Sequence, residues 1–343
     1  MGVFLIFISG LSAGFRGWCI PKFRKYGIEH WLLIYIVLGV MILPWLTCFL
    51  FIPNLSEIIK SMDIKNLILA NGFSVSFALA NIIYSYCFVK IGFTVASSVL
   101  GGTAITFGAI TPMIIKGTGD FADCADPLSL PGIITISATV LLTISVVLVS
   151  LAGMEREKQK GTYKTVKIDS SYFWYVFLSI VSGILCLGTV FISVYCQDQI
   201  MSAMNLYGTP KSLCYVGVWA FTMLGNGLTT LIYALIYIIK DKKIKNFCEI
   251  KDFFMSVSAG LLFFIYLLFL SIGSVLAGPL GASIAGGVGQ AATTGGTQLL
   301  GVIYGEWKGI KGRPITLIIW GILLLFAGIG AISVANTVFI YSR

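Results

Sequence analysis

The chain alternates between long apolar runs and short polar loops, and this alternation limits how it can fold. A membrane-spanning helix needs about 20 apolar residues, and ten runs have about that length. Hydrophobic residues make up 57% of the chain and charged residues 11%, against about 25% charged in soluble domains. Because lipid cannot satisfy backbone polar groups, the sequence predicts an all-α integral membrane protein with ten transmembrane helices. The runs are 2–20, 30–52, 66–89, 92–115, 131–152, 173–195, 211–239, 253–276, 279–303 and 315–338.

The two halves of the chain carry similar patterns in the same order. Val3–Gly10 reads VFLIFISG and Val176–Gly183 reads VFLSIVSG, and an Ile-Gly pair opens the fourth run (Ile91-Gly92) and precedes the ninth (Ile272-Gly273). Five spans per half place the second copy in the opposite orientation, as in the inverted repeats of secondary transporters. Chance recurrence of short apolar patterns is the alternative. The predicted units are a first five-helix repeat at 1–152, a cytoplasmic basic linker at 153–170 and a second five-helix repeat at 171–343.

The basic residues predict the orientation in the membrane, because cytoplasmic loops are rich in Lys and Arg. Of the 23 Lys and Arg residues, the even-numbered loops hold only Lys60, Lys65, Lys116 and Lys211, and nearly all the others lie in odd-numbered loops. We therefore expect a multi-pass cell-membrane protein with cytoplasmic odd-numbered loops and both termini outside. This pattern also explains the net charge of +9 without nucleic acid as a partner.

Two glycine-rich segments are expected at the centre of the bundle. Gly273–Trp307 contains ten glycines, although each costs about 1 kcal/mol in a helix relative to Ala. Gly92–Lys116 has the same character. Small residues allow transmembrane helices to approach closely, so we expect the fourth and ninth spans to enclose a polar chamber near the membrane midplane.

Arg16 is the sharpest candidate site residue, because an ionisable group within a membrane span is costly and is a functional hypothesis by default. It lies five residues before Pro21, so its side chain could also reach the interface by snorkelling. Structural pairing, with Glu306 as a partner, is another alternative. If Arg16 contacts substrate, an anionic group such as a carboxylate becomes plausible.

Several neutral polar residues are further candidates for substrate binding, with helix–helix hydrogen bonding as the alternative for each. Asn81 and Tyr84 share one helical face at i and i+3, and small neighbours flank Asn226. A stripe on the ninth run consists of Gln290, Thr293, Thr294 and Gln298. Aromatic faces for a sugar ring could come from Trp18, Tyr84 and Tyr266. Asn71 is expected to be an interfacial cap, and the single histidine, His30, a solvated or interfacial residue without partners.

No pattern in the sequence indicates catalysis, a cofactor or a metal site. The eight cysteines are scattered without a C-x-x-C pair, which favours small buried residues over a metal or disulfide framework. Asp198 and Glu306 are the nearest candidates for proton coupling, with ordinary interfacial charges as the alternative. An integral membrane enzyme and a receptor or structural protein remain the competing classes.

Several stretches resemble the L-rhamnose–proton symporter family of the drug/metabolite transporter superfamily. They are spread over nearly the whole chain, and the resemblance implies ten helices in two inverted repeats and proton-coupled uptake of a small sugar or sugar-like metabolite. The stretches are Pro21–Lys25, Leu43–Trp45, Ile52–Leu55, Asn81–Tyr84 with Gly92, Ala152-Gly153 before a charged run, Glu306-Trp307 and Gly312–Thr316.

The chain departs from the family pattern at positions where substrate contact is expected. Tyr266 stands where an amide-bearing residue is expected, the ninth run is richer in glycine, and Gly14–Ile20 appears as an insertion that brings in Arg16. The substrate is therefore left open between rhamnose and another small sugar or polar metabolite. A facilitator or exchanger of an anionic sugar acid is the alternative function.

Overall fold

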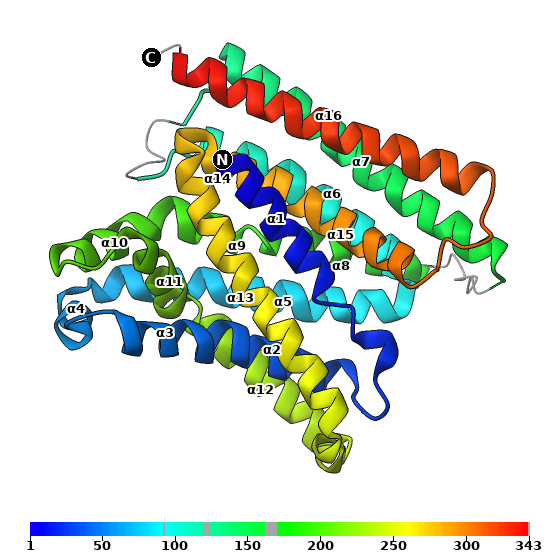
Figure 1. Ribbon diagram of the computed structural model, residues 1–343, viewed down its shortest axis with the longest axis horizontal. Coiled ribbons are helices and arrows are strands. Elements are labelled where there is room, and N and C mark those ends of the chain that lie inside the picture. The colour runs from blue at the N-terminus through cyan, green and yellow to red at the C-terminus, as the bar shows by residue number, and fades with distance from the viewer. Residues whose placement is uncertain (92, 119–123, 162–169, 342–343) are drawn as a thin grey trace.

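The computed structural model describes residues 1–91, 93–118, 124–161 and 170–341, and every regular element among them is a helix (Figure 1). Six helices are long and apolar enough to cross a membrane, or seven if the bent pair α11–α12 counts as one span. The prediction of an all-α chain built from long apolar helices is thus confirmed. The helices are α1 (Gly2–Phe15), α2 (Ile28–Ile36), α3 (Leu43–Phe51), α4 (Leu55–Ser61), α5 (Ile64–Ile91), α6 (Phe93–Ile114), α7 (Leu130–Gln159), α8 (Ser170–Leu185), α9 (Gly188–Phe191), α10 (Gln197–Leu206), α11 (Lys211–Thr222), α12 (Leu224–Lys240), α13 (Ile250–Leu276), α14 (Gly281–Ile284), α15 (Gln290–Ile303) and α16 (Arg313–Tyr341).

Three π-helical segments interrupt these helices within the described residues. They are η2 (Val37–Ile42) between α2 and α3, η4 (Ile192–Cys196) between α9 and α10, and η7 (Ala285–Gly289) between α14 and α15. Such π-bulges occur often at functional sites. The helix α7 continues to Gln159, into the segment expected to be a linker, and an i,i+3 ion pair between Glu155 and Lys158 supports its last turns (3.0 Å).

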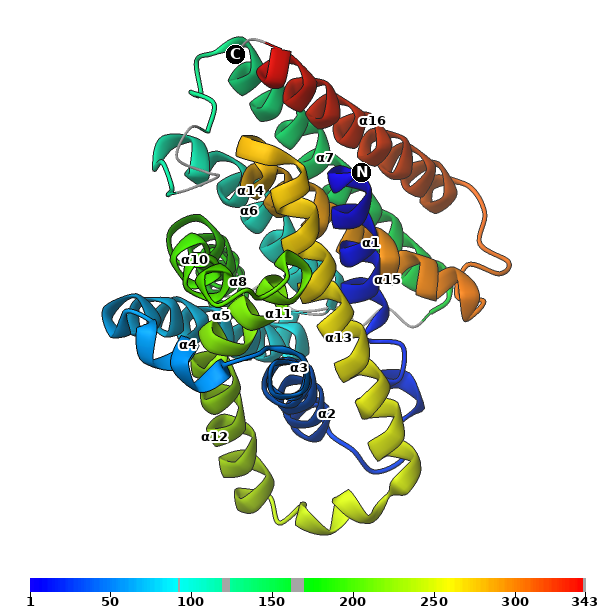
Figure 2. The ribbon, with the colours of Figure 1, turned by 60° about the vertical axis from the view of Figure 1, so that its left-hand side comes forward.

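The packing brings helices from distant parts of the sequence together. The first helix, α1, packs against α13 and α15, whereas α8 packs against α5 and α6. Figures 1 and 2 show α7 and α16 side by side along one edge of the molecule, and these two helices also contact each other extensively. The glycine-rich helices α6 and α14–η7–α15 contact each other inside the bundle.

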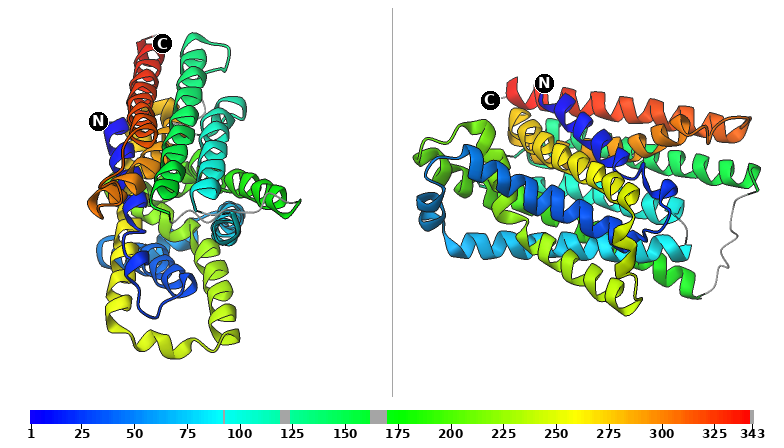
Figure 3. Two further views of the ribbon diagram at one scale, coloured as in Figure 1. Left: turned by 90° about the vertical axis from the view of Figure 1, so that its right-hand side faces the viewer. Right: turned by 60° about the horizontal axis from the view of Figure 1, so that its bottom comes forward.

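The connections divide between the two ends of the bundle. In Figure 3 the end of α7 and the connection between α15 and α16 lie at one end, together with the connection between α12 and α13. The short helix α4 and the connection between α10 and α11 lie at the other end, toward which the start of α1 and the end of α16 also point. The chain therefore begins and ends toward the same end of the bundle.

The break between α11 and α12 is held by Asn71 on α5, and the two helices meet at an angle of 47°. The Asn71 amide accepts a hydrogen bond from the Gly225 N–H (2.8 Å) and donates one to the Phe221 carbonyl (2.9 Å). These backbone groups lie at the break, where helices leave such groups unsatisfied. Our expectation of an interfacial cap was therefore wrong, since Asn71 caps a break within the bundle.

The first loop is attached to the start of α13 by one buried carboxylate. Asp252 has no exposed surface, and it accepts hydrogen bonds from the backbone N–H groups of Arg24, Lys25 and Tyr26 at 2.9–3.2 Å. Burial, together with the negative charge of Asp252, raises the pKa of Tyr26 to about 12, so this side chain stays neutral at physiological pH. Consecutive N–H groups that converge on a carboxylate form a strong anion-binding concavity.

His30 is buried rather than solvated, contrary to expectation. Its Nδ1 accepts a hydrogen bond from the Gly27 N–H (3.3 Å), and its Nε2 lies 3.1 Å from the Lys243 carbonyl oxygen. The ring also stacks on Tyr26, with the ring centroids 5.0 Å apart. The histidine therefore ties the loop before α2 to the loop after α12.

Candidate functional site

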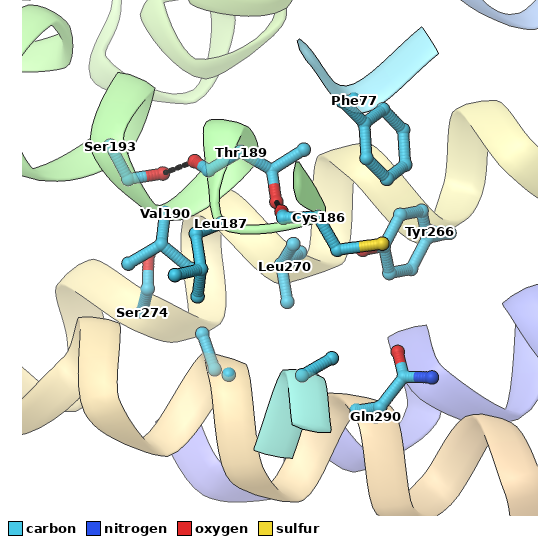
Figure 4. A pocket seen from close by; sticks show the side chains of 13 residues that line it. Phe77, Cys186, Leu187, Thr189, Val190, Ser193, Tyr266, Leu270, Ser274 and Gln290 are labelled. Atoms are coloured by element: carbon cyan, nitrogen blue, oxygen red, sulfur yellow. Dashed lines mark hydrogen bonds between the residues drawn. The ribbon is translucent and has the colours of Figure 1, made fainter. Parts of the chain in front are cut away.

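A small cavity lies inside the bundle between helices from both halves of the sequence (Figure 4). Its volume is about 70 Å³, and because each water needs about 10–15 Å³, it has room for roughly five water molecules. Ligand pockets are usually larger, about 300–1,000 Å³, so a metabolite would need the surrounding helices to move apart. The lining residues are Phe77 (α5), Ala104 (α6), Cys186, Leu187, Thr189, Val190 and Ser193 (α8–η4), Tyr266, Leu270 and Ser274 (α13), and Ala285, Gly286 and Gln290 (η7–α15).

The glycine-rich helices meet at one side of this cavity. A Cβ atom added to Gly286 would lie 2.8–3.0 Å from backbone atoms of Gly108, so no larger residue fits at Gly286 without moving one of the helices. Ala104, one turn from Gly108 on α6, lines the cavity together with Gly286. The glycines therefore place α6 and η7 in direct backbone contact, and the two helices form part of the cavity wall.

Polar groups reach the cavity from three sides. Thr189 and Ser193 come from α9 and η4, and Ser274 comes from α13. The hydroxyls of Thr189 and Ser193 donate hydrogen bonds to carbonyls of their own helical segment. Gln290 differs, because its side-chain amide makes no hydrogen bond with the described residues, and Figure 4 shows it pointing into the cavity on the side of Tyr266. An amide offers both donors and an acceptor, so Gln290 can bind a hydroxyl group.

Arg16 lies near this cavity and is half-buried. Its guanidinium carbon is 5.1 Å from the centroid of the Phe263 ring and 5.4 Å from that of the Tyr35 ring. The Phe263 ring in turn stacks on that of Tyr266, which lines the cavity. Phe263 is fully buried and is the central residue of the 27-residue helix α13. At 1.5 Å per residue, Phe263 lies about 20 Å along the helix from either end.

The charge of Arg16 is only partly compensated. Arg16 follows the last residue of α1 as its C-cap. Each cation–π contact contributes about 0.5–2 kcal/mol, but neither ring supplies a hydrogen-bond acceptor. Within the described residues the guanidinium makes no ion pair and no hydrogen bond. Glu306, the partner that we considered, instead pairs with Arg156 at 2.6 Å.

Three predicted site residues, Arg16, Tyr266 and Gln290, are brought together at or beside the cavity. The Tyr266 ring stacks on Phe263, with centroids 5.5 Å apart, which continues the aromatic wall from Arg16 into the cavity. Thr294 follows Gln290 on α15, and both side chains face Gly101 of α6. Gln298 lies two turns beyond Gln290, and its Oε1 atom is buried without a partner among the described residues.

Four other predicted residues lie elsewhere. Trp18 donates a hydrogen bond to Ser258 Oγ (3.0 Å) and lies under the Lys22 ammonium. Asn226 is fully buried, and its amide oxygen accepts a hydrogen bond from Thr230. The remaining pair lies along α5, where Asn81 donates to the Phe77 carbonyl (2.9 Å) and Tyr84 packs in the hydrophobic cluster around Cys87 and Ile91. In this conformation none of the four lines the cavity.

The two candidate coupling residues also lie away from the cavity. Glu306 forms its ion pair with Arg156, whose guanidinium lies 5.0 Å from the centroid of the Trp307 ring. This cluster joins the end of α7 to the connection after α15. Asp198 is half-buried in the first turn of α10. Among the described residues that line the cavity, none carries a carboxylate.

Sequence reasoning missed most of the sixth-run residues that line the cavity. Cys186, Thr189 and Ser193 gave no signal, because small polar residues are common in apolar runs. Gly188, a glycine within the sixth run, was the usable sequence signal. In the structure a Cβ atom there would overlap the Phe73 carbonyl of α5, and the helix changes to η4 four residues later. An interrupted membrane helix is the best sequence pointer to a transporter binding site.

No protein-family model matches the chain, and the curated proteins contain no significant match. The cavity, the partly compensated charge of Arg16 and the free amide of Gln290 are therefore the observations from which a function can be argued.

Proposed function

We propose that this protein is a secondary transporter that moves a small sugar or sugar-like metabolite by alternating access. The observation that carries the proposal is the cavity itself, because helices from both halves of the chain line it and polar groups reach it. Transporters bind their substrates at such a position, between repeats and near the membrane midplane. An integral membrane enzyme would instead need reactive groups that converge in a pocket, and the described lining offers no such set.

We further propose ten spans arranged as two inverted repeats. Ten results if the six long helices, the bent pair α11–α12, α1, α6 and the series α14–η7–α15 each cross once. An even number of spans agrees with chain ends that lie toward the same end of the bundle. The packing also supports two related repeats, because the first helix of each half packs against helices of the other half. The helix α1 packs on the eighth and ninth runs, whereas α8 packs on the third and fourth.

The glycines of the repeated Ser-Gly pairs lie at these contacts between the two halves. A Cβ atom added to Gly10 on α1 would overlap the Gly289 carbonyl and lie 2.6 Å from Ala292 Cβ. One added to Gly183 on α8 would lie 2.6 Å from Thr103 Cβ and 2.9 Å from the Leu100 carbonyl. Each glycine thus allows its helix to contact the glycine-rich helix of the other half.

In the proposed topology the protein lies in the cell membrane, with odd-numbered loops in the cytoplasm and both termini outside. The Lys and Arg distribution supports this orientation. Proton coupling depends on the family resemblance, because the described cavity lining has no carboxylate. The absence of a substrate-induced pH change in loaded vesicles would favour exchange or facilitated transport over proton symport.

The proposed function is tested by counterflow in proteoliposomes with neutral deoxysugars, hexoses, and uronic and aldonic acids. We expect at least one of these solutes to accumulate. We also expect Gln290→Ala to slow its uptake about threefold to tenfold, the usual effect of one lost hydrogen bond. Gln199→Ala on the exposed surface of α10 is the matched control and should transport normally. Failure of every solute, or equal uptake by both variants, would contradict the proposal.

A further inference from the structure

The strongest unused feature of the molecule is a cation beside the middle of α13 that has no anionic partner among the described residues. The Arg16 guanidinium contacts the rings of Phe263 and Tyr35 at 5.1 and 5.4 Å. The structure shows no carboxylate within 4.0 Å of it among the described residues, whereas Arg156, at the end of α7, pairs with Glu306 at 2.6 Å. The chain thus pairs the arginine near the end of α7 with a carboxylate, whereas Arg16 has only aromatic contacts among the described residues.

The aromatic rings around Arg16 contact its guanidinium but do not accept hydrogen bonds from its N–H groups. Its ring contacts lie on α2 and α13, and the Tyr35 and Phe263 rings meet edge to face with centroids 5.4 Å apart. Aromatic faces attract a cation, but five N–H donors of a guanidinium seek oxygen acceptors. A planar guanidinium matches a carboxylate by two parallel hydrogen bonds.

The groups beyond Arg16 are neutral and suit hydroxyls. Tyr266 continues the aromatic wall toward the cavity, where Gln290 offers a free amide. No described lining residue carries a positive charge, so Arg16 is the cation that the site offers. A phosphate dianion is usually bound by several positive groups. One positive charge beside neutral hydrogen-bonding groups fits a solute with one carboxylate and several hydroxyls.

We infer that the transported solute is a hydroxylated monocarboxylate, such as a sugar acid, whose carboxylate binds Arg16 while its hydroxyl groups face Tyr266 and Gln290. This inference rests on the proposed transport function and specifies its substrate class. Binding brings an anion to an uncompensated charge within the membrane, so the loaded site is neutral. The neutral sugars of the transport panel lack this anion and bind weakly.

The test compares matched pairs of solutes that differ only in the carboxylate: galacturonate with galactose, and glucuronate with glucose. Binding is followed by the melting temperature of the purified full-length protein in detergent, and transport by counterflow in proteoliposomes. We expect at least one acid to raise the melting temperature and to be exchanged, and its neutral partner to do neither. Arg16→Lys should weaken acid binding roughly tenfold or more, because an ammonium loses the bidentate geometry.

Arg16→Met distinguishes a binding role from a structural one. If the guanidinium serves to bind substrate, its removal eliminates a charge that has no anionic partner, so the apo protein should melt at a higher temperature. The increase in melting temperature on addition of the acid should be lost. Lower stability together with an unchanged acid response would overturn the inference. Arg24→Gln, at a guanidinium with 63% side-chain exposure in the first loop, is the matched control and should change neither quantity.

The remaining outcomes separate this inference from the proposed function. If a neutral sugar binds and is exchanged as well as its acid partner, transport stands and the assignment of a carboxylate is wrong. If neither acids nor neutral sugars bind or exchange, both fail.

Discussion

Gly10→Ala and Gly183→Ala should each prevent assembly of a stable bundle. A methyl group at Gly10 meets the Gly289 carbonyl and lies 2.6 Å from Ala292 Cβ, and one at Gly183 lies 2.6 Å from Thr103 Cβ. Carbonyl oxygens and Cβ atoms are both held in place by the helix backbone, so the helices must separate. Overpacking costs about 1–3 kcal/mol and sometimes more, and here it also opens the contact between the two halves.

The measurement is the yield of monodisperse protein by fluorescence-detected size-exclusion chromatography, followed by the melting temperature. The matched controls are Gly72→Ala on α5 and Gly330→Ala on α16, where an added Cβ atom meets nothing within 4 Å. These two should express as well as the native chain, since Ala favours a helix over Gly by about 1 kcal/mol. Normal behaviour of both Gly10→Ala and Gly183→Ala would show that the close packing described above is wrong.

Asp252→Ala should also cause a large loss of stability. The carboxylate has no exposed surface and accepts three backbone hydrogen bonds from the first loop. Each hydrogen bond to a charged group contributes about 1.5–3 kcal/mol, although water can replace part of this at Arg24 and Lys25. We therefore expect a loss of about 3 kcal/mol or more, which corresponds to a fall of about 6 °C or more in melting temperature.

Glu249→Gln is the matched control for this prediction, because Glu249 precedes Asp252 by one turn but pairs only with the exposed Lys25 and Arg24 (3.4 and 3.9 Å). Such surface pairs contribute about 0–1 kcal/mol, so the melting temperature should change by about 2 °C or less. Asp252→Asn should fall between the two variants, because it keeps one acceptor and loses the charge. Equal effects of Asp252→Ala and Glu249→Gln would refute the role given to the buried carboxylate.

Hydropathy was enough to predict the helices, because membrane spans are limited by one physical quantity, the thickness of the hydrocarbon core. The run at 253–276 corresponds to α13 (Ile250–Leu276), and the run at 30–52 to the continuous helix from Ile28 to Phe51. The glycine content likewise predicted that the fourth and ninth runs lie inside the bundle, since small residues allow helices to approach closely. The number of spans and the repeat remain proposals.

The position of individual polar groups could not be predicted in the same way. Asn71 and Asn226 look alike in sequence, yet Asn71 bridges the break between two helices and Asn226 is enclosed by its own helix and α5. The difference depends on which helix lies opposite, and hydropathy does not report this. Arg16 shows the same limit, because its sequence distance from Pro21 left both an interfacial and an interior side chain open. The structure places the side chain over the middle of α13.

The central claim is that the cavity opens to each side of the membrane in turn. Ser193→Cys places a thiol in the cavity lining. Ile184→Cys places one on the exposed surface of the helical bundle, at a side chain of α8 that is 42% exposed. Both are introduced into a chain whose native cysteines are replaced by alanine and whose transport is retained. Each is then treated with a membrane-impermeant thiol reagent in right-side-out and inside-out vesicles. The account predicts that Ser193→Cys is labelled from both faces and protected by the transported solute, whereas Ile184→Cys is labelled from neither; labelling of Ser193→Cys from one face only, or from none, would contradict it.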